Sequence, residues 1–244
     1  MFFQGIRAKS IFVCDGARNR DSRRTFPVVP TKNSSLLPHC IDLLFIYLKL
    51  PIAKEEIIMS QTYTLDELQQ MVHNCQGCQL CRTRTNTVFG EGNPHASLMF
   101  IGEGPGRDED LQGRPFVGRA GQLLDKMIAA MGLQRQQVYI GNIVKCRPPN
   151  NRTPLPDEAA ACINFIKWQI YLVQPKVIVL LGATAAHYLL DDPRGIMRLR
   201  GNWLNYQGIP VMPTYHPAFL LRQENAKRDA WQDLQQVMAR LECP

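Results

Sequence analysis

Short, continuous apolar runs alternate along the chain with longer segments in which apolar residues recur every three or four positions. Three runs, at 97–102, 139–144 and 176–181, have the length and apolar content of buried strands. The segments between them have the period of helices, most clearly 123–131, where apolar residues gather on one helical face. Strands that alternate with helices of this length form parallel sheets covered on both faces. We therefore predict an α/β fold of three layers, α/β/α, around a central, mostly parallel sheet.

The flanking segments complete this pattern. Thr64 and Glu67 form a capping-box sequence, which predicts a short helix that ends near Cys75. The other predicted elements are helices at 156–172, 184–190 and 227–241, and a pair of strands at 203–206 and 210–215 that meet across "QGI". Parallel sheets bind ligands at the carboxyl ends of their strands, so candidate site residues are expected just after strands.

Residues 1–58 lack a sustained helical or strand period. They hold nine of the 28 Lys and Arg residues but five of the 21 Asp and Glu, and so carry more than half of the net charge. We interpret them as a poorly structured N-terminal extension to a domain at 59–244, and Met59 as the natural start of the chain. A targeting peptide is the alternative interpretation, although Asp15 and Asp21 fit it poorly.

The composition is that of a globular protein, with 45% hydrophobic residues. A net charge of +7 and a pI of about 9.1 favour polyanionic partners, either nucleic acid or an anionic membrane surface. The longest apolar run, 41–50, is interrupted by Asp42 and Lys49 and is too short to span a bilayer. We therefore expect no membrane-spanning segment, and of the two polyanionic partners we expect nucleic acid and no membrane.

Eight cysteines without a clear signal peptide indicate a reducing compartment, which we take to be the cytoplasm, and a metal site before disulfides. Cys75 and Cys78 form a C-x₂-C motif that Cys81 extends, and Cys146 and Cys162 form a second, wider pair. Four thiolates from two such pairs suit zinc or an iron–sulfur cluster, and spacing does not choose between them. The alternative for the second pair is that both are small buried hydrophobic residues.

Four motifs follow predicted strands or enter predicted helices: "GEGPGRDED" (102–110), "GRPFVGRAGQLLD" (113–125), "NIVKCRPPNNRTPLPDE" (142–158) and "YHPAFLLR" (215–222). Together they resemble the family 4 uracil-DNA glycosylases, the iron–sulfur branch of the uracil-DNA glycosylase superfamily. The resemblance covers nearly all of 59–244 and none of 1–58. It implies a three-layer, uracil-DNA glycosylase-like catalytic domain that removes uracil from single- or double-stranded DNA in base-excision repair, acting as a monomer.

The resemblance also implies a cofactor. Cys75, Cys78, Cys146 and Cys162 match the four thiolates that hold a [4Fe–4S] cluster in that family, and the pattern does not require Cys81. Cys146 would then pin the loop after its strand to the cluster. We expect a structural role for the cluster, not a redox-catalytic one.

A base inside a duplex must be flipped into a pocket before its glycosidic bond can be broken. Phe116 matches the family's stacking residue, and such stacking is worth about 1–3 kcal/mol per base. Asn142 carries an acceptor and donors that can meet N3–H and O4 of uracil, whereas cytosine presents the inverted pattern. Without the motifs, Phe116 would be taken as a core residue and Asn142 as a strand cap. Gly104 and Gly106 allow close approach of base and sugar.

His216 matches the family histidine that faces O2 of the departing uracil, where a preorganised donor stabilises developing charge. Glu103 stands where other branches have a water-activating carboxylate. Its role here is open: it could orient water, favour the cationic sugar, or help to exclude the methyl group of thymine. The acidic run that follows, 108–110, is interpreted as a solvated loop and not as a metal site.

Two groups of residues are candidates for DNA contacts. Lys145, Arg147 and Arg152 lie in the loop after the second strand and are candidate phosphate contacts. Leu220, Leu221 and Arg222 follow His216, where the superfamily inserts a wedge into the gap left by the flipped nucleotide. For this second group a plain helix start is the alternative interpretation.

Two rival functions fit the residues less well. A uracil-recognising relative that stays trapped on DNA would carry a basic insertion after "GEGPG", and this sequence has none. A noncatalytic, metal-stapled DNA-binding module would not need Phe116, Asn142 and His216 together. No lysine is placed as a Schiff-base nucleophile, so we expect a monofunctional glycosylase without strand cleavage. The motifs do not decide whether hypoxanthine or xanthine is also a substrate.

Overall fold

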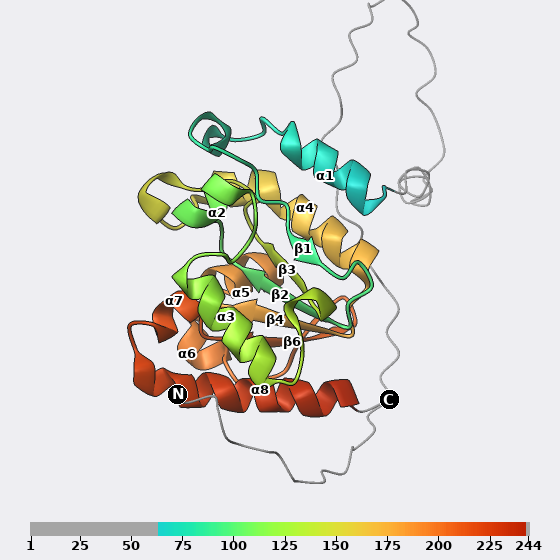
Figure 1. The fold of residues 1–244 in the computed structure, drawn as a ribbon, viewed down its shortest axis with the longest axis vertical. Coiled ribbons are helices and arrows are strands. Elements are labelled where there is room, and N and C mark those ends of the chain that lie inside the picture. Colours follow the sequence, from blue (N-terminus) through green and yellow to red (C-terminus); the bar gives the residue numbers. More distant parts are fainter. Residues whose placement is uncertain (1–62, 243–244) are drawn as a thin grey trace, which may run out of the picture.

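A six-stranded sheet forms the centre of the molecule, in the order β1-β3-β2-β4-β6-β5 (Figure 1). The computed structural model describes residues 63–242, so the extension predicted at 1–58 lies outside the described residues. β3, β2, β4 and β6 are parallel, whereas the edge strands β1 and β5 run antiparallel to their neighbours. The strands are β1 Glu91–Gly92, β2 Leu98–Gly102, β3 Tyr139–Asn142, β4 Val177–Leu181, β5 Leu204–Tyr206 and β6 Ile209–Thr214. The predicted mostly parallel sheet is therefore confirmed.

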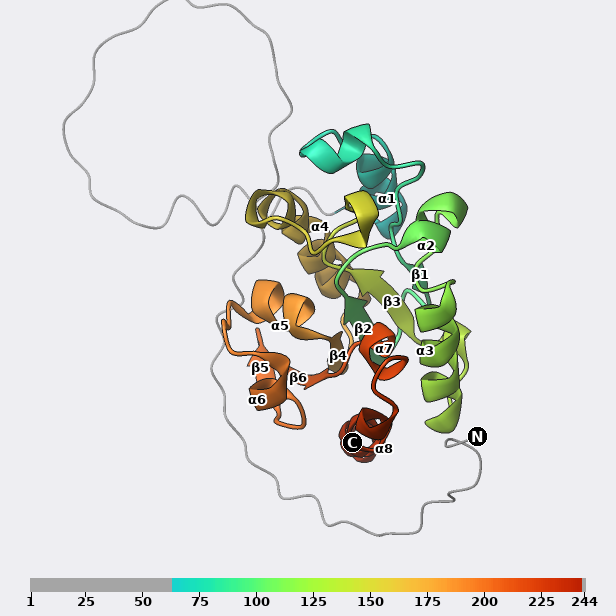
Figure 2. The same cartoon turned by 90° about the vertical axis from the view of Figure 1, so that its left-hand side faces the viewer.

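Helices cover both faces of this sheet (Figure 1 and Figure 2). Residues of α1, α4 and α5 bury their apolar sides in one core cluster, and residues of α3, α7 and α8 in a second. The longer helices are α1 Leu65–His73, α3 Arg119–Ala130, α4 Pro156–Val173, α5 Ala183–Leu190 and α8 Lys227–Glu242. The shorter ones are η2 Gln79–Arg82, α2 Arg107–Gln112, η3 Arg135–Gln137, η4 Pro149–Asn151, α6 Ile196–Leu199, α7 Pro217–Leu220 and η5 Glu224–Ala226.

β2 shows why the sheet needs cover on both sides. All five of its residues are buried. Met99 and Ile101 belong to the core cluster with α4, and Leu98 and Phe100 to the cluster with α3 and α8. Successive side chains of a strand point to opposite faces, so a continuous apolar strand requires two apolar layers. The three-layer architecture follows from this pattern.

The order of the strands reverses at β2. β3 pairs on one side of β2 and β4 on the other, so the chain moves in opposite directions from this strand. A crevice opens at such a switch point, outside the carboxyl ends of the strands. The segments that leave β2, β3, β4 and β6 therefore meet at one edge of the sheet.

Two local predictions need correction. β3 ends at Asn142, two residues earlier than predicted, although the N–H groups of Ile143 and Val144 still donate to the carbonyls of Gly102, at the end of β2, and Glu103. The acidic run 108–110 is not a solvated loop, because it lies in α2 and two of its members, Glu109 and Asp110, hold neighbouring loops. Asp110 is 3% exposed and accepts hydrogen bonds from the main chain of Thr85 and Asn86.

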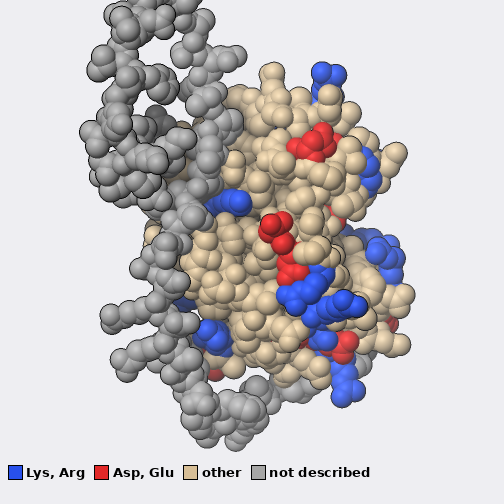
Figure 3. All heavy atoms as spheres, turned by 180° about the vertical axis from the view of Figure 1, so that it is seen from behind, with Lys and Arg blue, Asp and Glu red and all other residues tan. Residues whose placement is uncertain are grey.

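The surface and the helices bear on the expected partners. On the face shown in Figure 3, basic and acidic side chains of the described residues lie interspersed. None of the helices within 63–242 is long and apolar enough to cross a membrane.

Candidate active site

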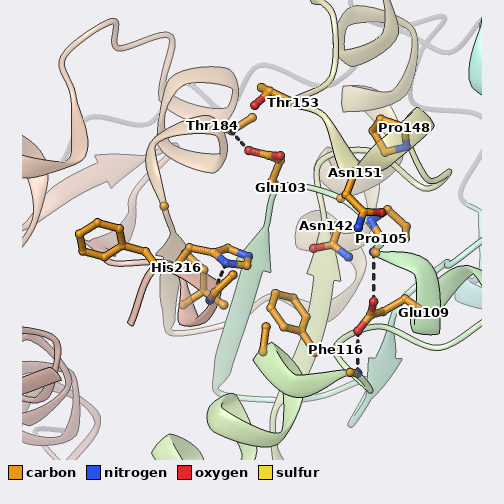
Figure 4. A pocket seen from close by; sticks show the side chains of 18 of the residues that line it. Glu103, Pro105, Glu109, Phe116, Asn142, Pro148, Asn151, Thr153, Thr184 and His216 are labelled. Carbon is orange, nitrogen blue, oxygen red and sulfur yellow. Dashed lines mark hydrogen bonds between the residues drawn. The ribbon is translucent and has the colours of Figure 1, made fainter. Parts of the chain in front are cut away.

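A cavity of about 580 Å³ opens at the carboxyl edge of the sheet (Figure 4). Its wall includes Glu103 after β2, Asn142 at the end of β3, Gly182 after β4 and His216 after β6. Phe116, from the loop between α2 and α3, completes the wall. The amide, the phenyl ring and the imidazole predicted from three separate motifs thus line one cavity.

Asn142 is buried but not satisfied. Its side chain is 1% exposed, and Oδ1 has no hydrogen-bond partner within the described part of the chain. Gly102 makes room for it, because a Cβ at this glycine would lie 2.5 Å from Oδ1 of Asn142 and 2.5 Å from Cζ of Phe116. A buried polar atom without a partner costs about 1–3 kcal/mol. Oδ1 is therefore suited to receive a donor from a ligand.

Phe116 adopts a backbone conformation that non-glycine residues rarely adopt, with φ at 51°. Arg135 donates to the carbonyl oxygens of Pro115 at 2.5 Å and Phe116 at 3.2 Å. Gly121 allows this arrangement, since a Cβ there would lie 1.8 Å from the carbonyl oxygen of Phe116. The ring of Phe116 lies 5.6 Å from that of His216, with the planes 32° apart.

Glu109 holds the other side of the Phe116 loop. Its carboxylate accepts hydrogen bonds from the N–H groups of Val117 and Gly118, both at 2.9 Å, and of Gly106 at 3.1 Å (Figure 4). One side chain therefore joins the loop after β2 to the loop that carries Phe116. The sequence placed Glu109 in an acidic run but offered no sign of this contact.

His216 is the N-cap residue of α7. Its Nδ1 accepts a hydrogen bond from the N–H of Ala218 at 3.1 Å, so the proton of the neutral imidazole lies on Nε2. Burial, with a smaller contribution from the charge of Arg222, lowers the pKa of His216 to about 4. The ring is therefore neutral at neutral pH and has an N–H to offer to the cavity.

Glu103 and Gly104 lie directly after β2 and both line the cavity. The carboxylate of Glu103 accepts a hydrogen bond from the hydroxyl of Thr184, in the first turn of α5 (Figure 4). Gly104 packs close to Val144. Thr184 was not predicted from the sequence, because a threonine near a helix start has common capping uses.

The predicted DNA contacts divide into accessible and buried side chains. Arg152 and Arg222 line the cavity, and Arg222 is exposed. Arg152 is tied to Glu158 by two hydrogen bonds of 2.8 and 2.7 Å, and the half-buried Arg147 donates to Asn151 at 2.7 Å. Leu221 is half-buried beside α7. Sequence reasoning missed two further exposed arginines that line the cavity, Arg107 and Arg119.

Two of the predicted DNA contacts are wrong. Lys145 is 1% exposed and its Nζ donates to the carbonyl of Asn142 and to Oε1 of Gln169 inside the protein. Leu220 is fully buried in the core cluster that includes α3 and α8. Neither side chain can reach a phosphate or a base from these positions. Both predictions assumed that a residue in a loop lies at the surface. They were wrong because burial depends on segments that are distant in the sequence.

The four predicted metal ligands line a second, smaller cavity. Cys75 and Cys78 follow α1, Cys146 follows β3, and Cys162 lies on α4. Cys81 also borders this cavity. Burial raises the pKa of the Cys162 thiol to about 12 and raises that of Cys146 despite a hydrogen bond from Arg84. Such thiols are unreactive unless a metal stabilises the thiolate.

The cysteine cavity brings together thiols from two distant segments of the chain, a donor set that suits zinc or an iron–sulfur cluster. Within residues 63–242, no three His, Cys, Asp or Glu side chains are placed to hold one metal ion. Three N–H groups also point at the sulfurs, from Gly77 to Cys75, from Lys145 to Cys162 and from Arg84 to Cys146.

Comparison with known proteins gives a consistent result. A family model described as "Uracil DNA glycosylase superfamily" matches residues 89–235. A protein of Thermotoga maritima named Type-4 uracil-DNA glycosylase is 50% identical over 171 residues, which are 67% of this chain and 88% of that protein. Proteins of the same name from Sulfurisphaera tokodaii and Archaeoglobus fulgidus are 43% and 40% identical, each over 71% of this chain and over 83% and 92% of their own length.

Proposed function

The chain belongs to the uracil-DNA glycosylase superfamily and to its type-4 branch, and on this premise we propose that the cavity at the carboxyl edge of the sheet excises uracil from DNA. The reaction is hydrolysis of the N-glycosidic bond, which leaves an abasic site and begins base-excision repair. The C1′–N1 bond breaks with its electron pair on uracil. A water molecule adds its oxygen to C1′ and gives up one proton, which balances the charge of the departing uracil anion.

The observation that carries this proposal is the unpaired Oδ1 of Asn142. The atom is buried and has no partner within the described residues, and its residue lines the cavity. N3–H of uracil supplies the missing donor, and the amide NH₂ of Asn142 meets O4. Cytosine has an acceptor at position 3 and donors at position 4, so it would leave both groups unsatisfied, at about 1–3 kcal/mol each. Discrimination against cytosine follows from this mismatch.

Phe116 and His216 contact different parts of the same base, Phe116 its ring face and His216 its O2. Phe116 supplies an apolar ring on which uracil stacks. His216 donates Nε2–H to O2, where negative charge gathers as the glycosidic bond breaks. Because the ring is neutral and fixed by Ala218, the donor needs no rearrangement when the charge develops.

Glu103 faces the sugar side of this arrangement in our proposal. Its carboxylate, held by Thr184, favours a cationic sugar and can orient the attacking water. None of the described residues that line the cavity is a lysine. A Schiff base with C1′ is therefore not part of the mechanism, and the enzyme is monofunctional.

The cysteine site supports the active-site cavity indirectly, through the loop between Cys146 and Cys162. We assign Cys75, Cys78, Cys146 and Cys162 to a [4Fe–4S] cluster, whose contribution is to cross-link segments of the chain. The loop between the last two cysteines carries Asn151, Arg152 and Thr153, which line the active-site cavity. We further propose that 59–244 is the catalytic domain and 1–58 an extension, and that the enzyme works in the cytoplasm on single- or double-stranded DNA. One chain supplies every cavity residue named here, so a monomer suffices.

Incubation with a uracil-containing oligonucleotide, followed by alkaline cleavage of abasic sites, tests the function. We expect cleavage at uracil, none at cytosine or thymine in the same sequence, and no cleavage before alkali. An unchanged oligonucleotide after treatment with folded, cluster-loaded protein would reject the proposal.

A further inference from the structure

The amino group of Lys145 lies buried in the middle of the protein. Its side chain is 1% exposed and is among the largest fully buried ones. Nζ donates to the main-chain carbonyl of Asn142 at 2.8 Å and to Oε1 of Gln169 at 2.6 Å. Both acceptors are neutral, so they take two of the three hydrogen bonds that an ammonium can donate but do not balance its charge.

To be charged in this position, the amino group needs a counter-ion, since an uncompensated buried charge costs several kcal/mol. None of the ion pairs within residues 63–242 includes Lys145. The residue does border the cysteine cavity, together with Cys146 and Cys162. Its own main-chain N–H donates to Sγ of Cys162 at 3.3 Å. The cysteine site is therefore the available source of negative charge.

Arg84 approaches the same site from another segment of the chain. Its Nη1 donates to Sγ of Cys146 at 3.1 Å, and its Nη2 to the carbonyl of His73 at 3.4 Å. The guanidinium is half-buried and borders the cavity. Four thiolates around a [4Fe–4S]²⁺ core form a dianion. Two cations, one buried and one at the rim, match that charge.

We propose that Lys145 and Arg84 are the counter-ions of the cluster, and that Lys145 is a positioning residue through which the cluster site holds the base-reading Asn142. The second half rests on the proposed function. Lys145 connects the end of β3 to Gln169 on α4, the helix that also carries Cys162. Gln169 in turn donates to the carbonyl of Phe89 and to the hydroxyl of Tyr139 at the start of β3, both at 2.9 Å. A network around one ammonium thus fixes both ends of the strand that presents Asn142.

The midpoint potential of the cluster tests the counter-ion assignment without any substrate. A positive charge beside a cluster favours its reduction, so loss of that charge makes the potential more negative. We expect this shift in full-length, cluster-loaded Lys145→Gln, Lys145→Met and Arg84→Gln, measured by protein-film voltammetry. Arg82→Gln is the matched control, because Arg82 is an exposed cation on η2 in the same segment. Potentials that equal those of wild type and Arg82→Gln would overturn the assignment.

The two substitutions of Lys145 separate charge from positioning. Lys145→Gln keeps an N–H donor for the carbonyl of Asn142, whereas Lys145→Met removes it. Single-turnover excision of uracil should be about three- to tenfold slower in Lys145→Met than in Lys145→Gln, the range expected for one neutral hydrogen bond. Equal rates would overturn the positioning role.

Two further outcomes are also decisive. If Lys145→Met does not fold, Gln169→Met replaces it, since that variant keeps the ammonium but removes its anchor on α4. It should slow excision at an unchanged cluster potential, and a wild-type excision rate would overturn the positioning role. If the potentials shift as expected but wild-type protein excises no uracil, the proposed function fails while the counter-ion assignment stands.

Discussion

The N–H of Ala218 donates to Nδ1 of His216 at 3.1 Å, which leaves Nε2 as the protonated nitrogen of the neutral ring. The contact is a product of local structure, because His216 is the N-cap residue of α7 and its side chain caps the helix. The same cap therefore fixes both the orientation and the tautomer of the side chain that faces the departing base.

The first prediction concerns pH. The pKa of His216 is lowered from its ordinary value of 6.5 to about 4, mainly by burial, so the neutral donor persists in mild acid. We expect the single-turnover rate to show no inflection near pH 6.5 that depends on His216, and the His216-dependent loss to begin only as pH approaches about 4. An inflection near pH 6.5 that is absent from His216→Asn would contradict the neutral-donor mechanism.

The free energy of unfolding should depend on pH through the same histidine. The unfolded chain binds a proton at His216 below about pH 6.5, whereas the folded protein does so only near pH 4. Stability contributed by the neutral histidine is therefore present above pH 6.5 and is lost as pH falls toward 4. Comparison of the melting temperature of wild type with that of His216→Asn across this window isolates the contribution. His216→Leu should in addition excise uracil about 10²–10³-fold more slowly, because the donor is lost.

The second prediction concerns base choice. Asn142→Asp removes the NH₂ that meets O4 of uracil and leaves two acceptors, so excision of uracil should slow by about tenfold to a hundredfold. The rate ratio of uracil to cytosine should fall as well, because N4–H₂ of cytosine can now donate to the carboxylate. Phe116→Leu is the control, since loss of stacking should slow excision of any base without lowering that ratio. An unchanged ratio in Asn142→Asp would assign the reading of the base to another residue.

The sequence was sufficient for the features that depend on local pattern or on motif order. Apolar runs and helical periods predicted the sheet and its covering helices. The order of four motifs predicted that Asn142, Phe116 and His216 share one site, and the structure places all three on one cavity. Lys145 and Leu220 were misjudged because their burial is determined by α4 and by the layer of α3 and α8, far along the chain. Arg135 and Glu109 were missed for the same reason, because both hold the loop that carries Phe116 through hydrogen bonds between segments that are distant in the sequence.

The third prediction tests the loop that presents Phe116. Gly121→Ala would place a methyl group 1.8 Å from the carbonyl oxygen of Phe116, a main-chain atom that cannot yield without moving the loop. We expect the free energy of unfolding to fall by roughly 3 kcal/mol, at the upper end of overpacking effects, together with a lower excision rate. Gly195→Ala is the matched control, because a Cβ at Gly195 meets no atom within 4 Å and its φ is −69°. Equal stability of the two variants in thermal unfolding would show that the loop adapts freely.

The fourth prediction separates the four cluster ligands from the fifth cysteine on the same cavity. Cys81 borders that cavity, but we assign the ligands to Cys75, Cys78, Cys146 and Cys162. Cys81→Ser should therefore keep wild-type iron content and the broad absorbance at about 400 nm. Cys146→Ser should lose most of both. As a ligand, Cys146 would anchor the loop that carries Asn151, Arg152 and Thr153, so its loss should also slow uracil excision and lower the melting temperature. If Cys81→Ser lost its iron and Cys146→Ser kept it, Cys81 and not Cys146 would be the cluster ligand. Zinc without iron in the purified wild-type protein would instead replace the cluster by a single ion.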